Sequence, residues 1–255
     1  MARYRLVKIA IVIMTLGAVV HAQPAPEHIR RGDEAYRVRK ADEALVHFMR
    51  AIVLEPANYE AQWKASRAES DLAEAAGLSA NKRLVESAEL HAQAAVRLRP
   101  DLADGHFALV RALRLRSLDA GVRDRARFAD AIRSEALAAL QADPQHPGAL
   151  HALGMWHAEL MRVNGMSRKF ALWFLGADLF ESANWDDAQQ LLEDAVRLDP
   201  GRIIHRLNLA GIYADRGDKT RARQMYASIA SFPLVDPNDD LYKRQAAERL
   251  AKLGS

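Results

Sequence analysis

The residues best suited to chemistry in this sequence are arginines that share predicted helices with aromatic side chains. Trp63 and Arg67 lie in one such helix, and Phe107, Arg111 and Arg114 lie in another. Aromatic and arginine side chains dominate the hot spots of protein interfaces, and a guanidinium binds a carboxylate through two parallel hydrogen bonds. These residues therefore predict a protein or peptide partner that offers an acidic segment or a C-terminal carboxylate.

Residues for catalysis or metal binding do not form a recognisable set. The sequence lacks the phosphate-loop, dinucleotide-binding, zinc-protease and serine-hydrolase motifs. It has no cysteine, which excludes disulfides and thiolate sites. His151 and His157 are six residues apart, so on one straight helix they point about 120° away from each other and cannot hold one metal ion together. We therefore predict a protein that is not an enzyme and has no catalytic, metal or cofactor site.

The net charge of the chain depends on its first residues. Arg3, Arg5 and Lys8 are the charged residues of the segment 1–22, which has no acidic residue. Setting this segment aside reduces the 36 basic residues of the chain to 33, against 33 acidic ones. A neutral remainder has no overall attraction for nucleic acid or anionic lipid, so neither is expected as a partner.

The same first residues have the plan of a signal peptide. Basic residues precede a 12-residue apolar run, Ile9–Val20, and small residues at Val20 and Ala22 suit cleavage before Gln23. As a helix this run is about 18 Å long, which is short for a hydrocarbon core of about 30 Å. We expect cleavage between Ala22 and Gln23 and a periplasmic or secreted protein. The alternative is an uncleaved N-terminal segment that would be the chain's membrane anchor.

Prolines and small residues recur through the rest of the chain at matching places. A proline lies five residues after an alanine four times, at Ala51/Pro56, Ala95/Pro100, Ala139/Pro144 and Ala195/Pro200. Each proline ends a helical run, because it lacks an N–H and clashes with the preceding turn. The first helix of four units carries a small residue at the matching place, with Val110 the exception: Gly32, Ser66, Gly154 and Ala210. Glycine inside a helix, as at Gly32 and Gly154, indicates a close helix contact. This is the pattern of tetratricopeptide repeats, and it fits better than HEAT-type repeats, which also form long helix pairs.

The predicted fold is therefore all-α, a right-handed α-solenoid of about five helix pairs within a single domain, residues 23–255. The expected units are 25–58, 59–102, 103–146, 147–202 and 203–233, followed by a capping helix over 236–253. The fourth unit contains an aromatic insertion at 166–181.

Two stretches go beyond the general repeat pattern. One runs Tyr59-Glu-Ala-Gln-Trp63-Lys-Ala, and the other runs His151-Ala-Leu-Gly154-Met-Trp156-His and continues after the insertion with Trp185-Asp-Asp-Ala188. Their order, with long middle repeats, resembles the regulator of microtubule dynamics protein family over roughly residues 27–253. The resemblance implies a tetratricopeptide protein without a catalytic residue set. It also implies association with microtubules and organelle membranes, from which the leader of this chain departs.

The concave groove of the solenoid is the expected binding site, because the first helix of each pair lines it. Eight residues are predicted to face this groove: Trp63, Arg67, Phe107, Arg111, Arg114, His151, Met155 and Glu159. Replacing Arg67 and Arg111 by alanine should weaken partner capture without lowering the melting temperature.

Three functions fit these features. The first is a non-catalytic scaffold that holds a partner protein in the cell envelope. The second is a membrane-anchored adaptor like the microtubule regulators. The third is an accessory domain that binds a small molecule through the insertion at 166–181.

Overall fold

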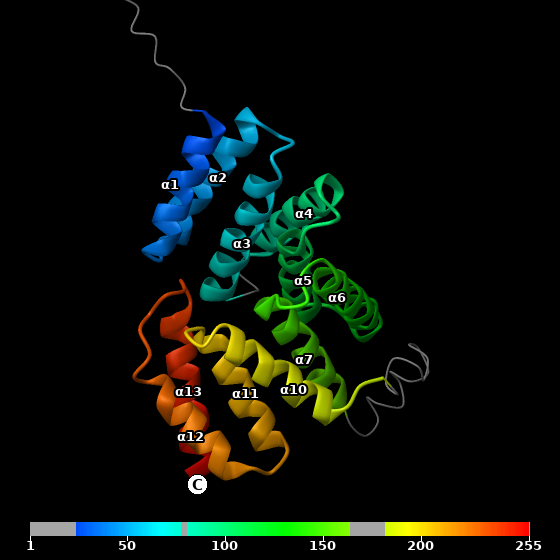
Figure 1. Cartoon of the computed structure of the whole chain (residues 1–255), viewed down its shortest axis with the longest axis vertical. Coiled ribbons are helices and arrows are strands. Elements are labelled where there is room, and N and C mark those ends of the chain that lie inside the picture. The colour runs from blue at the N-terminus through cyan, green and yellow to red at the C-terminus, as the bar shows by residue number, and fades with distance from the viewer. Residues whose placement is uncertain (1–23, 78–80, 164–181, 255) are drawn as a thin grey trace, which may run out of the picture.

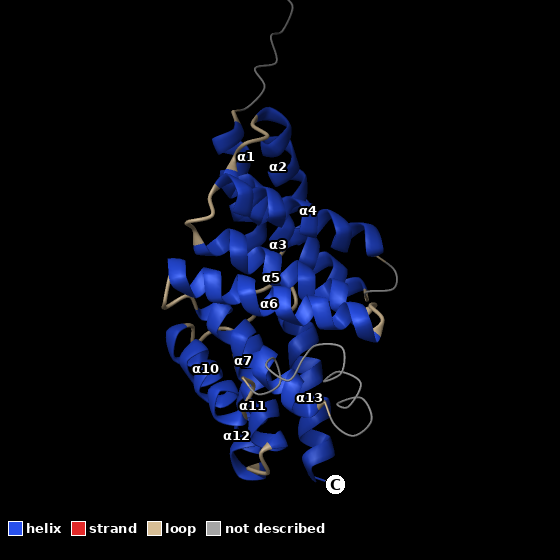
Figure 2. Ribbon diagram, turned by 90° about the vertical axis from the view of Figure 1, so that its right-hand side faces the viewer, coloured by secondary structure: helices blue, strands red, loops and turns tan. Residues whose placement is uncertain are grey.

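The computed structural model of the chain describes residues 24–77, 81–163 and 182–254. Regular secondary structure in these ranges is entirely helical (Figure 2). The helices are α1 (Ala25–Arg37), α2 (Ala41–Leu54), α3 (Tyr59–Ala76), α4 (Lys82–Leu98), α5 (Ala103–Leu118), α6 (Val122–Ala142), α7 (Pro147–Arg162), α10 (Trp185–Leu198), α11 (Ile203–Asp215), α12 (Lys219–Ile229) and α13 (Asp239–Gly254).

The helices pack in consecutive antiparallel pairs, and the pairs stack into a solenoid (Figure 1). The pairs are α1 with α2, α3 with α4, α5 with α6, α7 with α10, and α11 with α12. The predicted all-α repeat fold is therefore confirmed.

The helix ends follow from local sequence. The second helices α2, α4, α6 and α10 each end two residues before a proline, at Leu54, Leu98, Ala142 and Leu198. The residue before a proline avoids the helical conformation, so the helix stops there. At the other end, α3 begins at the side chain of Asn58, whose amide oxygen accepts the N–H of Ala61 at 3.0 Å.

Small residues let the helices of a pair approach closely. A Cβ atom on Gly32 would lie 2.7 Å from Cδ1 of Phe48, a side chain that is fully buried in α2. A Cβ atom on Gly154 would lie 3.1 Å from the carbonyl oxygen of Ala188 in α10. The predicted close contacts at Gly32 and Gly154 are therefore confirmed.

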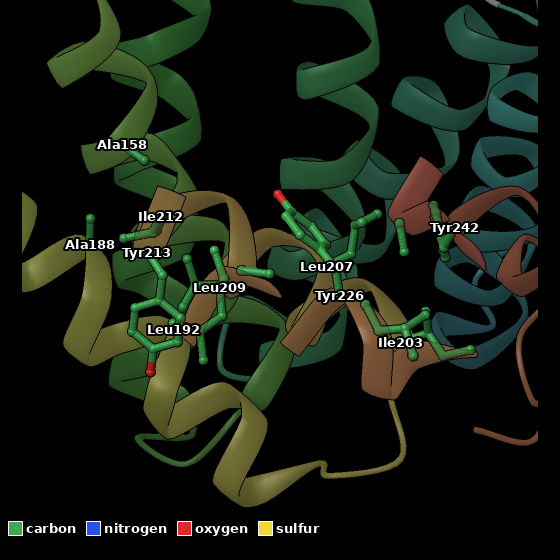
Figure 3. Close-up of a cluster of buried hydrophobic side chains, with 14 residues drawn as sticks. Ala158, Ala188, Leu192, Ile203, Leu207, Leu209, Ile212, Tyr213, Tyr226 and Tyr242 are labelled. Atoms are coloured by element: carbon green, nitrogen blue, oxygen red, sulfur yellow. The ribbon is translucent and has the colours of Figure 1, made fainter. Parts of the chain in front are cut away.

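The largest apolar cluster lies in the last third of the chain, between α7, α10, α11, α12 and α13 (Figure 3). Leu192, Ile203, Leu207 and Ile212 are completely buried in it. The clusters around α1 to α4 are smaller and consist largely of alanines. The C-terminal helices therefore contain the main hydrophobic core of the fold.

Helix α13 closes the stack. The side chains of Tyr242 and Ala246 are buried in the large cluster, and Leu250 and Leu253 pack against its edge. The stripe predicted for a capping helix is thus the side that α13 buries, although the helix begins at Asp239 rather than at 236. The segment before α13 carries the start of this helix back to the ends of α1 and α3 (Figure 1).

Two sequence predictions concern segments outside the described residues. They are the leader, with its cleavage site at Ala22/Gln23, and the aromatic insertion at 166–181. Among the helices that are described, none has both the length and the apolar character to cross a membrane.

Candidate functional site

The first helices of successive pairs lie side by side, since α1 contacts α3, α3 contacts α5, α5 contacts α7, and α7 contacts α11. Polar residues from these helices meet on one surface, which we call the inner face. We define it by Tyr36 of α1, Arg67, Asp71 and Glu74 of α3, Arg111 and Arg114 of α5, and His151 and Glu159 of α7.

Asp71 is the central residue where α1, α3 and α5 meet on the inner face. Its carboxylate accepts a hydrogen bond from the Tyr36 hydroxyl at 2.6 Å and another from Nη2 of Arg111 at 2.5 Å. The Asp71 side chain is only 6% exposed. Burial disfavours the charge on Arg111, but attraction to Asp71 outweighs this and raises the arginine pKa. Burial likewise raises the pKa of Tyr36, with the Asp71 charge adding to it, so Tyr36 acts as a donor.

Arg67 is held differently from its neighbours. Its guanidinium carbon lies 3.7 Å from the ring centroid of Tyr36 and 5.0 Å from that of Trp63. Its Nε atom is buried without a hydrogen-bond partner, and no carboxylate in the described part of the chain pairs with it. Two aromatic rings therefore fix a cation whose charge no acidic residue neutralises.

The C-terminal segment reaches the inner face from the opposite end of the chain. The side-chain amide of Asn238 donates to the main-chain oxygen of Asp71 at 3.1 Å, and the Tyr242 hydroxyl donates to Glu74 at 2.9 Å. Asp240 forms an ion pair of 2.7 Å with Arg39, in the turn after α1. We call these contacts the clasp, defined by Arg39, Asp71 and Glu74 on one side and Asn238, Asp240 and Tyr242 on the other.

His151 of the inner face contacts a second histidine, His205 of α11, which is buried. Asn208 donates to Nε2 of His151 at 2.9 Å, so His151 carries its proton on Nδ1 and donates to Nδ1 of His205 at 2.7 Å. Burial lowers the pKa of both rings, to about 3 for His205, and nearby arginines add to the effect. This pair is therefore neutral and structural at ordinary pH.

Glu159 combines exposure with a raised pKa. Its side chain is exposed to water, yet desolvation by surrounding protein raises the pKa of its carboxyl, while the charges of Arg114 and Arg162 oppose the rise. Glu159 therefore lies close enough to Arg114 and Arg162 for their charges to act on its carboxyl.

The predicted groove residues divide into two groups. Arg67, Arg111, Arg114, His151 and Glu159 belong to the inner face. Three others pack between helices, and each is only partly buried: Trp63 against the cluster of Ala92, Ala108, Leu109 and Leu113, Phe107 against Gly148 and His146, and Met155 against the large C-terminal cluster. Trp63, Phe107 and Met155 therefore pack between helices and are not part of the inner face.

The ion pair of Arg111 changes the expectation that replacing Arg67 and Arg111 by alanine leaves the melting temperature unchanged. The Arg111 guanidinium pairs with the nearly buried Asp71, so an alanine there would leave a buried carboxylate without its countercharge. The double replacement of Arg67 and Arg111 would consequently lower the melting temperature. Arg67 alone has no such partner and is the cleaner residue to test.

Sequence analysis did not identify Tyr36, Asp71, Glu74, Asn238 and Tyr242 as site residues. A signal existed for two of them, because Asp71 and Glu74 follow Arg67 by one and two turns on the same helix. Asn238 and Tyr242 had no such signal, since they are more than 160 positions from their partners Asp71 and Glu74.

Unsatisfied polar atoms concentrate on α3. Among the described residues, five buried side-chain polar atoms lack a hydrogen-bond partner, and four of them belong to α3, in Gln62, Ser66, Arg67 and Ser70. Such groups cost stability, and their concentration sets α3 apart from the other described helices. The arrangement can bind a carboxylate at Arg67 and hydrogen-bond donors at Asp71 and Glu74.

Other parts of the described structure are weaker candidates for a binding site. No group of three or more histidine, aspartate or glutamate side chains within the described ranges is arranged to hold a metal ion. An outer hollow of about 670 Å³ lies between α4, α5 and α6. Val85, Leu113 and Phe128 form part of its lining, together with charged residues of both signs.

Comparison with known proteins identifies the repeat. The family model described as regulator of microtubule dynamics protein 1-3 matches residues 28–254. No curated protein matches the chain significantly. A thermophilic TPR protein from Thermus thermophilus has a similar structure, with a TM-score of 0.65 and 21% identity over 89% of this chain and 99% of that chain. PilF of Pseudomonas aeruginosa gives a TM-score of 0.52 and 14% identity over 90% of this chain and 88% of that chain. At these identities the two structures show the fold alone.

Proposed function

The chain belongs to the regulator of microtubule dynamics protein 1-3 family, and from this we propose that it is a non-catalytic scaffold whose inner face binds an acidic segment of a partner protein. The helical repeat fold supports a role in protein interaction, because stacked helix pairs present an extended concave surface. The balanced charge of residues 23–255 favours a protein partner over nucleic acid.

The observation that carries this proposal is the environment of Arg67. Neighbouring arginines on α5 are already paired, Arg111 with Asp71 and Arg114 with Glu74. Arg67 has no carboxylate partner within the described structure, and the rings of Tyr36 and Trp63 hold it in place. A cation fixed before binding loses little conformational entropy when a carboxylate arrives, so Arg67 is the expected anchor for the partner's acidic group.

Site-specific photocrosslinking tests the proposal. The photoreactive amino acid benzoylphenylalanine replaces Glu159 on the inner face or, as a control, the exposed Arg83 on α4. We expect adducts with a partner protein from position 159. Arg67→Ala should reduce these adducts about tenfold or more, as the loss of a charge-assisted hydrogen bond requires, and Arg67→Lys should reduce them less.

The matched control is Arg83→Ala, which removes an arginine from the outer side and should leave the adducts unchanged. Circular dichroism melting of each variant verifies that it is folded. Equal adducts with and without Arg67, or equal adducts from positions 83 and 159, would contradict the proposal.

For location, we propose the cell envelope, on the basis of the basic and apolar leader before Gln23. Family membership favours one alternative, an adaptor that keeps its N-terminal segment in a membrane and faces the cytosol. Mass spectrometry of the N-terminus from fractionated cells separates the two. A chain that begins at Gln23 supports the envelope, whereas a chain that begins at Met1 or Ala2 in the membrane fraction supports the anchored adaptor.

A further inference from the structure

The clasp joins parts of the chain that are far apart in sequence. Asn238 and Tyr242 lie 167 and 168 positions from their partners Asp71 and Glu74. The start of α13 meets the ends of α1 and α3 at this point (Figure 1). The two ends of the solenoid therefore touch, and the C-terminal segment covers part of the inner face.

The clasp and the packing that fixes α13 to the stack share one residue, Tyr242, whose ring packs and whose hydroxyl belongs to the clasp. The Tyr242 ring, with Ala246, is buried among α11 and α12 in the large apolar cluster. The Asp240 side chain in the ion pair with Arg39 is 55% exposed, and exposed ion pairs contribute little to stability. Asn238 is instead buried, with only 4% of its surface exposed. Opening the clasp therefore means breaking the hydrogen bonds of Asn238 and of the Tyr242 hydroxyl, while the Tyr242 ring keeps its place in the apolar cluster.

The turn after α1 has an arginine, Arg39, at a position where helices commonly have a glycine. Arg39 adopts a φ of 65°, in the left-handed region that favours glycine at the end of a helix. Its side chain reaches Asp240 at 2.7 Å. A glycine would suit this backbone better but could not make the contact, so the arginine indicates that the clasp is a selected feature.

The clasp and Arg67 lie on one continuous set of contacts. The Arg67 guanidinium covers the ring of Tyr36, and the Tyr36 hydroxyl donates to the Asp71 carboxylate. The main-chain oxygen of the same Asp71 accepts from Asn238. A segment bound to Arg67 would therefore run directly into the clasp.

We infer that the α3 surface formed by Asp71 and Glu74 is the second half of the partner-binding site, and that the C-terminal segment occupies it as an intramolecular ligand. This inference rests on the proposed function of Arg67. The partner is a protein segment that displaces Asn238 and Tyr242 by offering the same hydrogen-bond donors, a side-chain amide or a phenol.

The spacing on α3 defines this partner further. Arg67 and Glu74 are seven residues apart, which is about 10 Å along a helix. An extended chain covers about 10 Å in three residues. A partner segment that binds in the extended conformation would therefore carry an acidic residue about three positions from an asparagine, glutamine or tyrosine.

A peptide-binding measurement on the full chain tests the inference. The probe is a fluorescein-labelled peptide with the sequence of residues 234–246. Its binding is followed by fluorescence anisotropy for the wild-type chain and for the variant Asn238→Ala/Tyr242→Phe, in which the Phe ring keeps the buried packing of α13. We expect the variant to bind the probe at least about tenfold more tightly, because its own segment no longer competes at high effective concentration.

The control probe is the same peptide carrying Asn238→Ala and Tyr242→Phe, which should bind the variant chain about tenfold more weakly than the unmodified probe. Equal binding of the two chains, equal binding of the two probes, or no binding to the variant chain would overturn the inference.

A tether provides an independent measurement. The sequence has no cysteine, so Arg39→Cys and Asp240→Cys introduce the only two thiols, which a bismaleimide with a reducible spacer can join. Closing the tether should abolish probe binding and the photocrosslinks from position 159, and cleaving the spacer should restore both. The control carries the same tether between Arg30→Cys and Glu34→Cys, one turn apart on α1, and should bind normally.

The outcomes also distinguish this inference from the proposed function. Crosslinks that depend on Arg67 but survive a closed tether would leave the proposed function standing and overturn the clasp as a competitor. Crosslinks that do not depend on Arg67 would contradict the proposed function. Tighter probe binding by the clasp variant would in that case still support a binding site on the α3 surface.

Discussion

Helices α3 and α11 have equivalent places in their repeats, yet they bury opposite kinds of side chain. In α11 the buried set is mainly aliphatic and includes Ile203, Leu207, Leu209 and Ile212. In α3 it consists of alanines together with polar and charged residues: Gln62, Lys64, Ser66, Glu69, Ser70 and Asp71. Each helix is a first helix with neighbours on both sides.

The difference indicates a division of labour within one repeat architecture. Aliphatic burial at α11 supplies hydrophobic stabilisation. Burial of polar groups at α3 stabilises little and leaves several atoms unsatisfied. A solenoid can tolerate one such helix because its neighbours hold it in place, and we place the recognition surface there.

The largest effect is expected from truncating the aliphatic helix. Leu207→Ala should lower the free energy of unfolding by about 3 kcal/mol, because Leu207 is completely buried and its loss leaves a cavity. Urea denaturation measures the change. The matched control on α3 is Ser70→Ala, which removes an equally buried hydroxyl without a partner and should leave stability unchanged or raise it by up to about 1 kcal/mol. Similar losses for both variants would refute the division of labour.

A somewhat smaller effect is expected from the charged network of α3. Arg111→Ala should destabilise the chain by about 2–3 kcal/mol, since it leaves Asp71 buried without its countercharge. Arg67→Ala should cost about 1 kcal/mol or less, because only ring contacts are lost. Thermal and urea denaturation of both variants test this order. Equal losses of stability would mean that the ion pair of Arg111 contributes no more than the ring contacts of Arg67.

The smallest effect concerns the buried histidine of α11. The folded-state pKa of His205, about 3, lies below the ordinary value of 6.5. Between these values the unfolded chain binds more protons than the folded chain, so stability falls as pH decreases. From pH 6.5 to pH 5 the loss should be about 1.7 kcal/mol.

The variant His205→Gln should lack this loss, so its stability should fall less steeply than that of the wild type over the same range. Arg202, His146 and His151 surround His205 and remain unchanged in the comparison. Parallel stability profiles for the two proteins would show that His205 does not carry the effect.

Sequence analysis predicted the fold well because repeats are local. The prolines that end α2, α4, α6 and α10 act within one turn, and Gly32 and Gly154 report contacts between adjacent helices. Such information survives in any short window of the sequence. The helical pairs and the apolar stripe of α13 could therefore be predicted.

The inner face was only partly predictable. Helix periodicity brought Arg67, Arg111 and Arg114 to one surface, but it could not decide which of them is neutralised. Asp71 is four residues after Arg67, a spacing that favours an ion pair within the helix, yet its carboxylate pairs with Arg111 of the next helix. That choice depends on the angle between two helices, which no local pattern records.

The clasp also bears on how the chain folds. Contacts in a stack of repeats are made between neighbours, so folding can begin at any pair and spread. The contact of Asn238 with Asp71 instead closes a loop of 167 residues, at an entropic cost of about 4–5 kcal/mol from a disordered chain. Once the intervening helices have stacked, most of that entropy is already lost. We therefore expect the clasp to form after the intervening helices have stacked, which would make it a reporter of whether the whole array between its two ends is in register.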